Sequence, residues 1–137
     1  MKQAVVVAAT LMISIPLAFA GKAEREYQKN ELTPSVTKAQ DTFKKACGCA
    51  LKINVNMTTI KEIDDMRQAR YITENVSDSV AGYCTDTESK KAMCAMKTLD
   101  ISKGKETKFT FAGGKGTAVT DGQSYVSFDM MTREVDK

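Results

Sequence analysis

Four cysteines are the residues of this chain best suited to chemistry. Cys47 and Cys49 are separated only by Gly48, and Cys84 and Cys94 follow further along the chain. Cysteines can form structural disulfides, exchange thiols or bind soft metal ions. In an exported protein, four cysteines are expected to form two disulfides, because an oxidising compartment lets such bonds persist.

The spacing of the cysteines restricts how they pair. Residues two apart in an extended strand have α-carbons about 6.6 Å apart, so a Cys47–Cys49 bond would need a strained turn. Pairing each of them with Cys84 or Cys94 avoids this strain. Each such bond closes a loop of tens of residues and stabilises by roughly 4 kcal/mol in the chain-entropy treatment. Cys47–Cys84 with Cys49–Cys94 and the reverse pairing both remain open.

Two other cysteine chemistries compete with structural bridges. A Cys47–Cys49 bond would make a thiol-disulfide redox protein, although neither the Cys-x-x-Cys spacing nor a thioredoxin-like βαβ context is present. The segment Met93-Cys94-Ala95-Met96 offers soft ligands for Cu(I), but methionines at helical spacing more commonly fill a core. We therefore expect no metal and no cofactor.

The composition excludes several classes of enzyme. The chain contains no histidine, so it has no Ser-His or Cys-His nucleophile pair and no imidazole metal ligand. The run Gly113-Gly114-Lys115-Gly116-Thr117 lacks the Lys-Ser/Thr pair of a phosphate loop, and we expect a hairpin turn there. Carboxylate or lysine chemistry is not excluded, but we identify no catalytic residue.

Residues 1–20 resemble a targeting segment. Lys2 precedes a short apolar run that ends before Pro16, and the small residues Ala18 and Ala20 precede a polar sequence. This pattern is typical of a secretory signal peptide cleaved after Ala20. The apolar run is shorter than the roughly 20 residues of a membrane-spanning helix. The sequence thus predicts a periplasmic or secreted protein without a membrane span after cleavage.

The remaining residues, 21–137, have the length of one domain. The whole chain has a formal net charge of +3, and removal of Lys2 with the signal peptide lowers it to +2. Nucleic acids and anionic membranes require a concentrated basic surface, so neither is an expected partner.

Helical patterns dominate the first two thirds of this domain. Residues 22–33 are highly charged and carry only Ala23, Tyr27 and Leu32 as a thin apolar stripe, so we expect a weak helix that docks only loosely or frays. Thr33 as N-cap and Pro34 at the first helical position predict a helix that ends near Gly48. A capping box at residues 59–62 opens the longest helical pattern, and a second, short helix is predicted after residues 85–88. The long helix carries apolar residues at steps of three and four, namely Ile63, Met66, Ala69, Ile72, Val76, Val80 and Tyr83.

Period-two alternation marks the strands. It covers residues 50–57 and then recurs in short segments from Leu99 onward. Asp121-Gly122 is a strong hairpin signal and predicts a last strand with Val119, Val126, Phe128 and Met130 on one face. Residues 132–137 are predicted to be a polar tail. The sequence therefore predicts an α+β fold with an antiparallel sheet of four to five strands, a C-terminal meander, and helices packed on one face and tied by disulfides.

The outward face of this meander is the candidate binding site. It would show Lys108, Thr110, Tyr125 and Ser127, with Tyr125 as an anchor because tyrosine is enriched at interface centres. Whether this face is exposed or covered is left open, and the oligomeric state is not indicated. We expect a small exported, non-catalytic binding protein, such as an inhibitor, an immunity-type partner or an accessory subunit, whose partner is another protein. The alternatives are the redox protein using Cys47 and Cys49, and a carrier with a small ligand between the long helix and the sheet.

Overall fold

The computed structural model describes residues 21–137 as helices packed on one mixed sheet. The predicted signal peptide, residues 1–20, lies outside the described residues. Along the described part no helix is long and apolar enough to cross a membrane. The elements are, in order, α2 (Lys22–Tyr27), the π-helix η2 (Gln28–Leu32), α3 (Thr33–Cys47), β2 (Lys52–Val55), α4 (Ile63–Tyr83), α5 (Thr87–Cys94), β3 (Thr98–Lys103), β4 (Lys108–Ala112), β5 (Lys115–Thr120) and α6 (Phe128–Val135).

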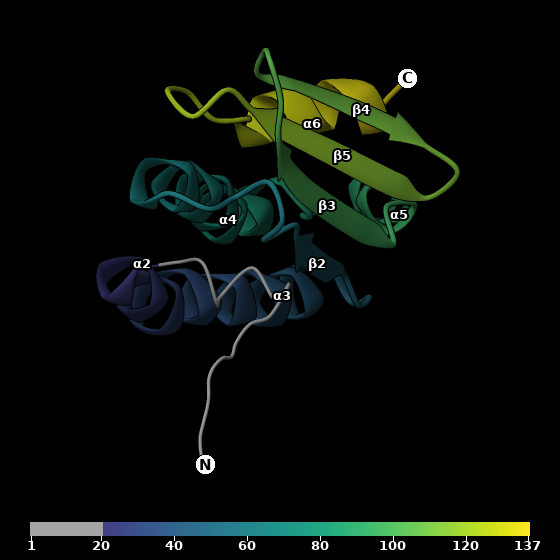
Figure 1. The fold of residues 1–137 in the computed structure, drawn as a ribbon. Coiled ribbons are helices and arrows are strands. Elements are labelled where there is room, and N and C mark those ends of the chain that lie inside the picture. Colours follow the sequence, from purple (N-terminus) through teal and green to yellow (C-terminus); the bar gives the residue numbers. More distant parts are fainter. Residues whose placement is uncertain (1–20) are drawn as a thin grey trace.

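The sheet has the strand order β2-β3-β5-β4. The pairs β2–β3 and β3–β5 are parallel, and only β4–β5 is antiparallel. Helices α4, α5 and α6 lie behind the sheet, and α3 runs beside its edge strand β2 (Figure 1). The α+β class and the two disulfides of the predicted fold are confirmed, whereas the purely antiparallel meander is wrong.

One face of the sheet belongs to the core and the other is polar. Leu99 and Ile101 of β3 and Ala118 of β5 are fully buried on the helix side. The opposite face carries exposed or half-exposed polar residues along every strand, such as Asn54 and Thr110. The outward face is therefore open to solvent among the described residues, which is one of the two alternatives that the sequence left open.

The strand predicted after Asp121-Gly122 is not formed. β5 already has β3 on one side and β4 on the other, so no edge of β5 is free to pair with a returning strand. The predicted polar tail is also wrong, because residues 128–135 form α6. Phe128, Met131 and Val135 recur at helical spacing and are buried. The hairpin turn predicted at residues 113–117 is confirmed, since Gly113 and Gly114 join β4 to β5.

The N-terminal segment is helical, but the break predicted before Pro34 is absent. Residues 22–32 are helical and run into α3 without a break; Leu32 at the end of this stretch is only 2% exposed, whereas α2 contains no buried residue. Pro34 lacks an N–H, and its ring would crowd the carbonyl of Asn30 in a regular α-helix. A wider turn accommodates the ring: Thr33 N donates to Gln28 O, five residues earlier. Pro34 is thus absorbed within a helix rather than starting one.

Two disulfides tie the helices together. Cys47 is bonded to Cys84 and Cys49 to Cys94, with Cα–Cα distances of 5.3 and 6.0 Å. This is one of the two cross-pairings that the sequence allowed, and it joins the end of α3 to the ends of α4 and α5. Residues 21–137 contain no free cysteine.

Candidate protein-binding surface

Three tyrosines and one arginine form a continuous row that we call the Tyr–Arg surface: Tyr27, Arg70, Tyr71 and Tyr125. The Arg70 guanidinium carbon lies 5.7 Å from the centre of the Tyr27 ring and 5.6 Å from that of Tyr71. The Tyr71 ring lies 5.5 Å from the Tyr125 ring, in a tilted arrangement. Tyr125 is 39% exposed and is the one large hydrophobic side chain that is exposed in the described chain.

Carboxylates fix Arg70 at the centre of the row. Arg70 Nη1 lies 2.6 Å from Glu31 Oε1, and its Nε lies 3.6 Å from Glu74 Oε2. Glu31 belongs to the π-helix η2, so the wider turn caused by Pro34 also supplies the main ion partner of Arg70. The guanidinium plane is thereby held between two aromatic rings, where cation–π attraction adds to the ion pairs.

Tyr27 closes the row at the N-terminal helix. Burial raises the pKa of the Tyr27 hydroxyl, and the positive charge of Arg70 opposes that rise only in part. Tyr27 therefore remains a neutral hydrogen-bond donor at physiological pH. Among residues 21–137 the buried Tyr27 hydroxyl and Arg70 Nε have no hydrogen-bond partner, although Arg70 Nε keeps its longer ion pair with Glu74. Buried polar groups are costly to leave without a hydrogen bond.

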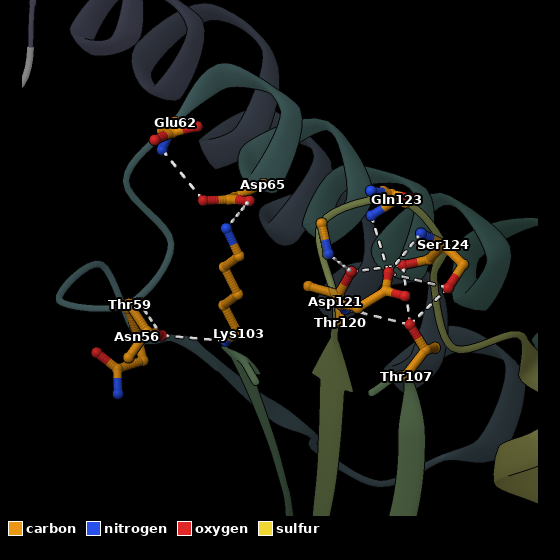
Figure 2. Close-up of polar contacts among 11 residues, drawn as sticks. Asn56, Thr59, Glu62, Asp65, Lys103, Thr107, Thr120, Asp121, Gln123 and Ser124 are labelled. Carbon is orange, nitrogen blue, oxygen red and sulfur yellow. Dashed lines mark hydrogen bonds and ion pairs between the residues drawn. The ribbon is translucent and has the colours of Figure 1, made fainter. Parts of the chain in front are cut away.

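The loop of residues 121–127 presents Tyr125, and polar contacts determine its shape (Figure 2). Asp121 Oδ1 accepts hydrogen bonds from the backbone N–H groups of Gln123 and Ser124, at 2.8 and 2.9 Å. These backbone bonds hold the pKa of the Asp121 carboxyl below its ordinary value. Thr120 Oγ1 accepts from Gly122 N and donates to the Ser124 carbonyl. The loop is thus a set of tight Asx- and Thr-based turns rather than a flexible connection.

Thr107 ties the same loop to the start of β4. Its hydroxyl accepts from Asp121 N at 3.1 Å and lies 2.5 Å from the Ser124 hydroxyl. The turn before β4 and the turn after β5 are therefore joined side by side, as Figure 2 shows. This leaves the loop little freedom to move Tyr125 away from α4.

The first turn of α4 supports the loop from the other side. Asp65 is 3% exposed, accepts from Glu62 N in a reciprocal capping box, and lies 3.1 Å from Lys103 Nζ. The hydrogen bond to Asp65, and next the negative charge of that carboxylate, raise the pKa of Lys103. Gly122 packs directly on this pair, since a β-carbon there would stand 2.9 Å from Asp65 Oδ1. The helix accordingly begins at Ile63, with Glu62 as N-cap, and not at the capping box predicted for residues 59–62.

Thr59 instead joins two strand ends. Its hydroxyl donates to the carbonyl of Asn56, just after β2, and accepts from Lys103 N at the end of β3, both at 3.1 Å. The carboxyl ends of the parallel strands β2, β3 and β5 therefore meet beside the start of α4, a position where ligands commonly bind in open α/β sheets. Here the contacts of Lys103 with Thr59 and Asp65 link the strand ends to the start of α4, beside the loop of residues 121–127 (Figure 2).

The predicted site residues do not form one face. Lys108 and Thr110 are exposed on the open side of β4. Tyr125 lies instead in the loop against α4, and Ser127 is the N-cap of α6, where it accepts from Met130 N. Of the predicted face, only Tyr125 belongs to the Tyr–Arg surface.

Tyr27, Arg70 and Tyr71 are not among the residues that the sequence predicts for the site. Arg70 and Tyr71 lie between the core positions Ala69 and Ile72 of the long helix. This position beside the apolar stripe is a sequence signal that their side chains are partly covered. Tyr27 was seen only as part of a thin apolar stripe in a charged segment. Nothing in the sequence indicates that these residues meet Tyr125, because they come from three segments far apart in the chain.

Comparisons with known proteins give no relative: no family model, curated protein or solved structure matches this chain.

Proposed function

We propose that this protein is a small exported binding protein that engages another protein through the Tyr–Arg surface. The observation that carries the proposal is the exposed ring of Tyr125, held against Tyr71 in a row with Arg70 and Tyr27. Tyrosine and arginine are among the residue types enriched in the centres of protein interfaces. A surface whose side chains are already ordered loses little entropy on binding.

The remaining features support the same class of function. Two disulfides suit an oxidising compartment, and together with the predicted signal peptide they favour the periplasm or the outside of the cell. An inhibitor, an immunity-type partner and an accessory subunit all need a stable presented surface and no reactive group. The redox alternative depended on a Cys47–Cys49 bond, but these cysteines are bonded to Cys84 and Cys94. The carrier alternative placed a ligand between α4 and the sheet, where buried side chains such as Ile72, Val76 and Leu99 belong to one core cluster.

The test is a partner capture with matched variants. The purified, disulfide-bonded protein would be immobilised and exposed to periplasmic or culture extract, and any retained protein would be titrated against the variants. We expect Tyr125→Ala and Tyr71→Ala to weaken binding at least tenfold, because anchoring aromatic side chains typically contribute more than about 1.4 kcal/mol. Lys108→Ala, on the far face of the sheet, is the control and should leave binding unchanged.

Thermal unfolding of each variant separates a lost contact from a lost fold. A partner that is retained by both tyrosine variants but lost by Lys108→Ala would show that the open sheet face, and not the Tyr–Arg surface, is the binding site. A fully folded protein that retains no partner from its native extract would contradict the proposed function itself.

A further inference from the structure

The two outer strands of the sheet are treated differently by the fold. At β2, the outward N–H of Ile53 donates to Gln40 Oε1 of α3 at 2.8 Å, so a helix side chain covers that edge. β4 is the outer strand on the other side, and within residues 21–137 no element continues the sheet beyond it. An uncovered edge offers unpaired backbone groups to another strand.

The register shows which groups of β4 are unpaired. Thr98 N donates to the carbonyl of Gly114, just before β5, and Gly104 N donates to Thr120 O at its end. Backbone groups alternate in direction along a strand, so the even-numbered residues of β5 form hydrogen bonds with β3 and the backbone groups of its odd-numbered residues point toward β4. Thr110 lies opposite Thr117, and Lys108 and Ala112 also lie opposite odd-numbered residues. These three residues of β4 therefore form the hydrogen-bonded pairs with β5. The N–H and C=O groups of Phe109 and Phe111 point outward, away from the sheet.

This edge is complementary to itself. If a second β4 runs antiparallel with a two-fold axis at Thr110, Phe109 of one copy lies opposite Phe111 of the other, and their free backbone groups form hydrogen-bonded pairs. Thr110 then faces Thr110, and Lys108 faces Ala112. Aromatic pairs and pairs of β-branched residues stabilise adjacent strands, and no like charges face each other within β4.

The side chains of β4 fit the same arrangement. Phe111 is only half-buried against the core, whereas Phe109 is 7% exposed, so a second strand would cover apolar surface that a single copy leaves open. β4 pairs with β5 residue for residue and contains no proline. It therefore lacks both a β-bulge and a proline, two features that keep many edge strands from pairing with another chain.

We propose that β4 is a dimerisation edge, at which a second copy of this chain pairs antiparallel through Phe109–Phe111 and joins two sheets into one continuous sheet. The contact is isologous, as closed two-fold dimers require. It involves neither α4 nor the loop of residues 121–127, so each copy keeps its Tyr–Arg surface. The inference is therefore independent of the proposed function.

Charge variants at the two-fold axis test the dimer. Thr110 is exposed, so Thr110→Lys and Thr110→Glu change little within one copy, but each places two like charges opposite each other across the interface. The disulfide-bonded protein would be measured by sedimentation over a series of concentrations. We expect wild type to dimerise with concentration and each variant to raise the dissociation constant at least tenfold. An equimolar mixture of the two variants should restore dimers, because the introduced lysine of one copy would then attract the introduced glutamate of the other.

The matched control is Asn54→Lys, which adds a charge to the same open face at the covered edge strand β2. It should leave the dimer unchanged, and circular dichroism would verify that all variants are folded. A wild-type protein that stays monomeric throughout the series would overturn the proposal. A dimer that resists both Thr110 variants, or that the mixture fails to restore, would also overturn it.

Discussion

At the scale of the residue, Tyr83 makes the free energy of unfolding fall with rising pH in the alkaline range. Burial, and next the hydrogen bond that its hydroxyl donates to Asp136, raise the pKa of Tyr83 to about 12 from 10.0. Between these two values the unfolded chain loses the proton and the folded chain keeps it, so the stabilisation present below pH 10 is lost as the pH rises toward 12. Tyr83→Phe removes this effect together with the hydrogen bond.

We therefore expect Tyr83→Phe to be less stable than wild type by about 1 kcal/mol at neutral pH. The difference should shrink steadily above about pH 10. Urea unfolding of both proteins at a series of pH values measures it. A difference that stays constant up to about pH 12 would show that Tyr83 does not titrate as the contact with Asp136 implies.

Gly116 gives a second prediction for a single residue. A β-carbon at this position would stand 2.5 Å from Met96 Sδ and 2.9 Å from Phe109 Cζ, in the tightly packed core under β5. Gly116→Ala should therefore destabilise by about 1–3 kcal/mol, as overpacking does. Gly82→Ala is the control, because it meets nothing within 4 Å and lies in α4, where alanine is favoured. A neutral effect of Gly116→Ala in denaturant unfolding would contradict this close packing.

The same close packing explains why the predicted core face of β5 is wrong. The hairpin register predicted from Asp121-Gly122 puts Val119 on the core face and therefore Ala118 and Thr120 on the outward face, but Ala118 and Thr120 are fully buried and Val119 is half-exposed. Small residues face the core on β5 because the side chains of Phe109 and Met96 already fill the space on the core side of Gly116. Which face of a strand is buried depends here on the size of neighbouring side chains, and the sequence does not show which side chains are neighbours.

At the scale of the element, α6 depends on its N-cap. Ser127 accepts from Met130 N at 3.4 Å, at the start of a helix of eight residues. Ser127→Ala should destabilise by about 1 kcal/mol, and Ser127→Asp, which keeps an acceptor, should retain most of the stability. Thermal unfolding of both variants measures this. Equal losses for the two would show that the cap does not hold α6.

Helices were easier to predict than the sheet, and α6 shows why. Val126, Phe128 and Met130 fit the alternation of a strand, while Phe128, Met131 and Val135 fit the period of a helix, so the local pattern supports both. The decision comes from tertiary structure, because β5 has no free edge for another strand. The long stripe of α4 had no such competing interpretation, and it was found without knowledge of its surroundings.

At the scale of the whole molecule, the Tyr–Arg surface exists because α2, α4 and the loop of residues 121–127 are brought together by the fold. The sequence predicts Tyr125 as an anchor, because this prediction rests on residue type alone. It could not supply Tyr27 or Arg70, because their contacts depend on how α3 packs along α4. A site built from distant segments can be predicted only when the topology of the fold is predicted as well. The local sequence patterns do not determine the strand order of the mixed sheet.

The two disulfides therefore have different consequences for this surface. Cys47–Cys84 closes 37 residues between α3 and α4, the two helices whose packing positions Tyr27 on Arg70, whereas Cys49–Cys94 closes 45 residues between the end of α3 and α5. Loops of these lengths predict similar stabilisation, about 4 kcal/mol each in the chain-entropy treatment. Replacing either pair by serine should thus lower the free energy of unfolding in urea by a similar amount, about 2–4 kcal/mol.

Binding through the Tyr–Arg surface should separate the two double variants. Loss of Cys47–Cys84 frees α3 to shift along α4, so the row from Tyr27 to Tyr71 loses its fixed geometry and partner affinity falls even where the protein is still folded. Loss of Cys49–Cys94 leaves the contact between α3 and α4 cross-linked, so affinity should be kept. Titration of the captured partner at a temperature well below both unfolding midpoints gives the comparison. Equal affinity losses in the two variants would mean that the disulfides stabilise the molecule as a whole and do not position the surface.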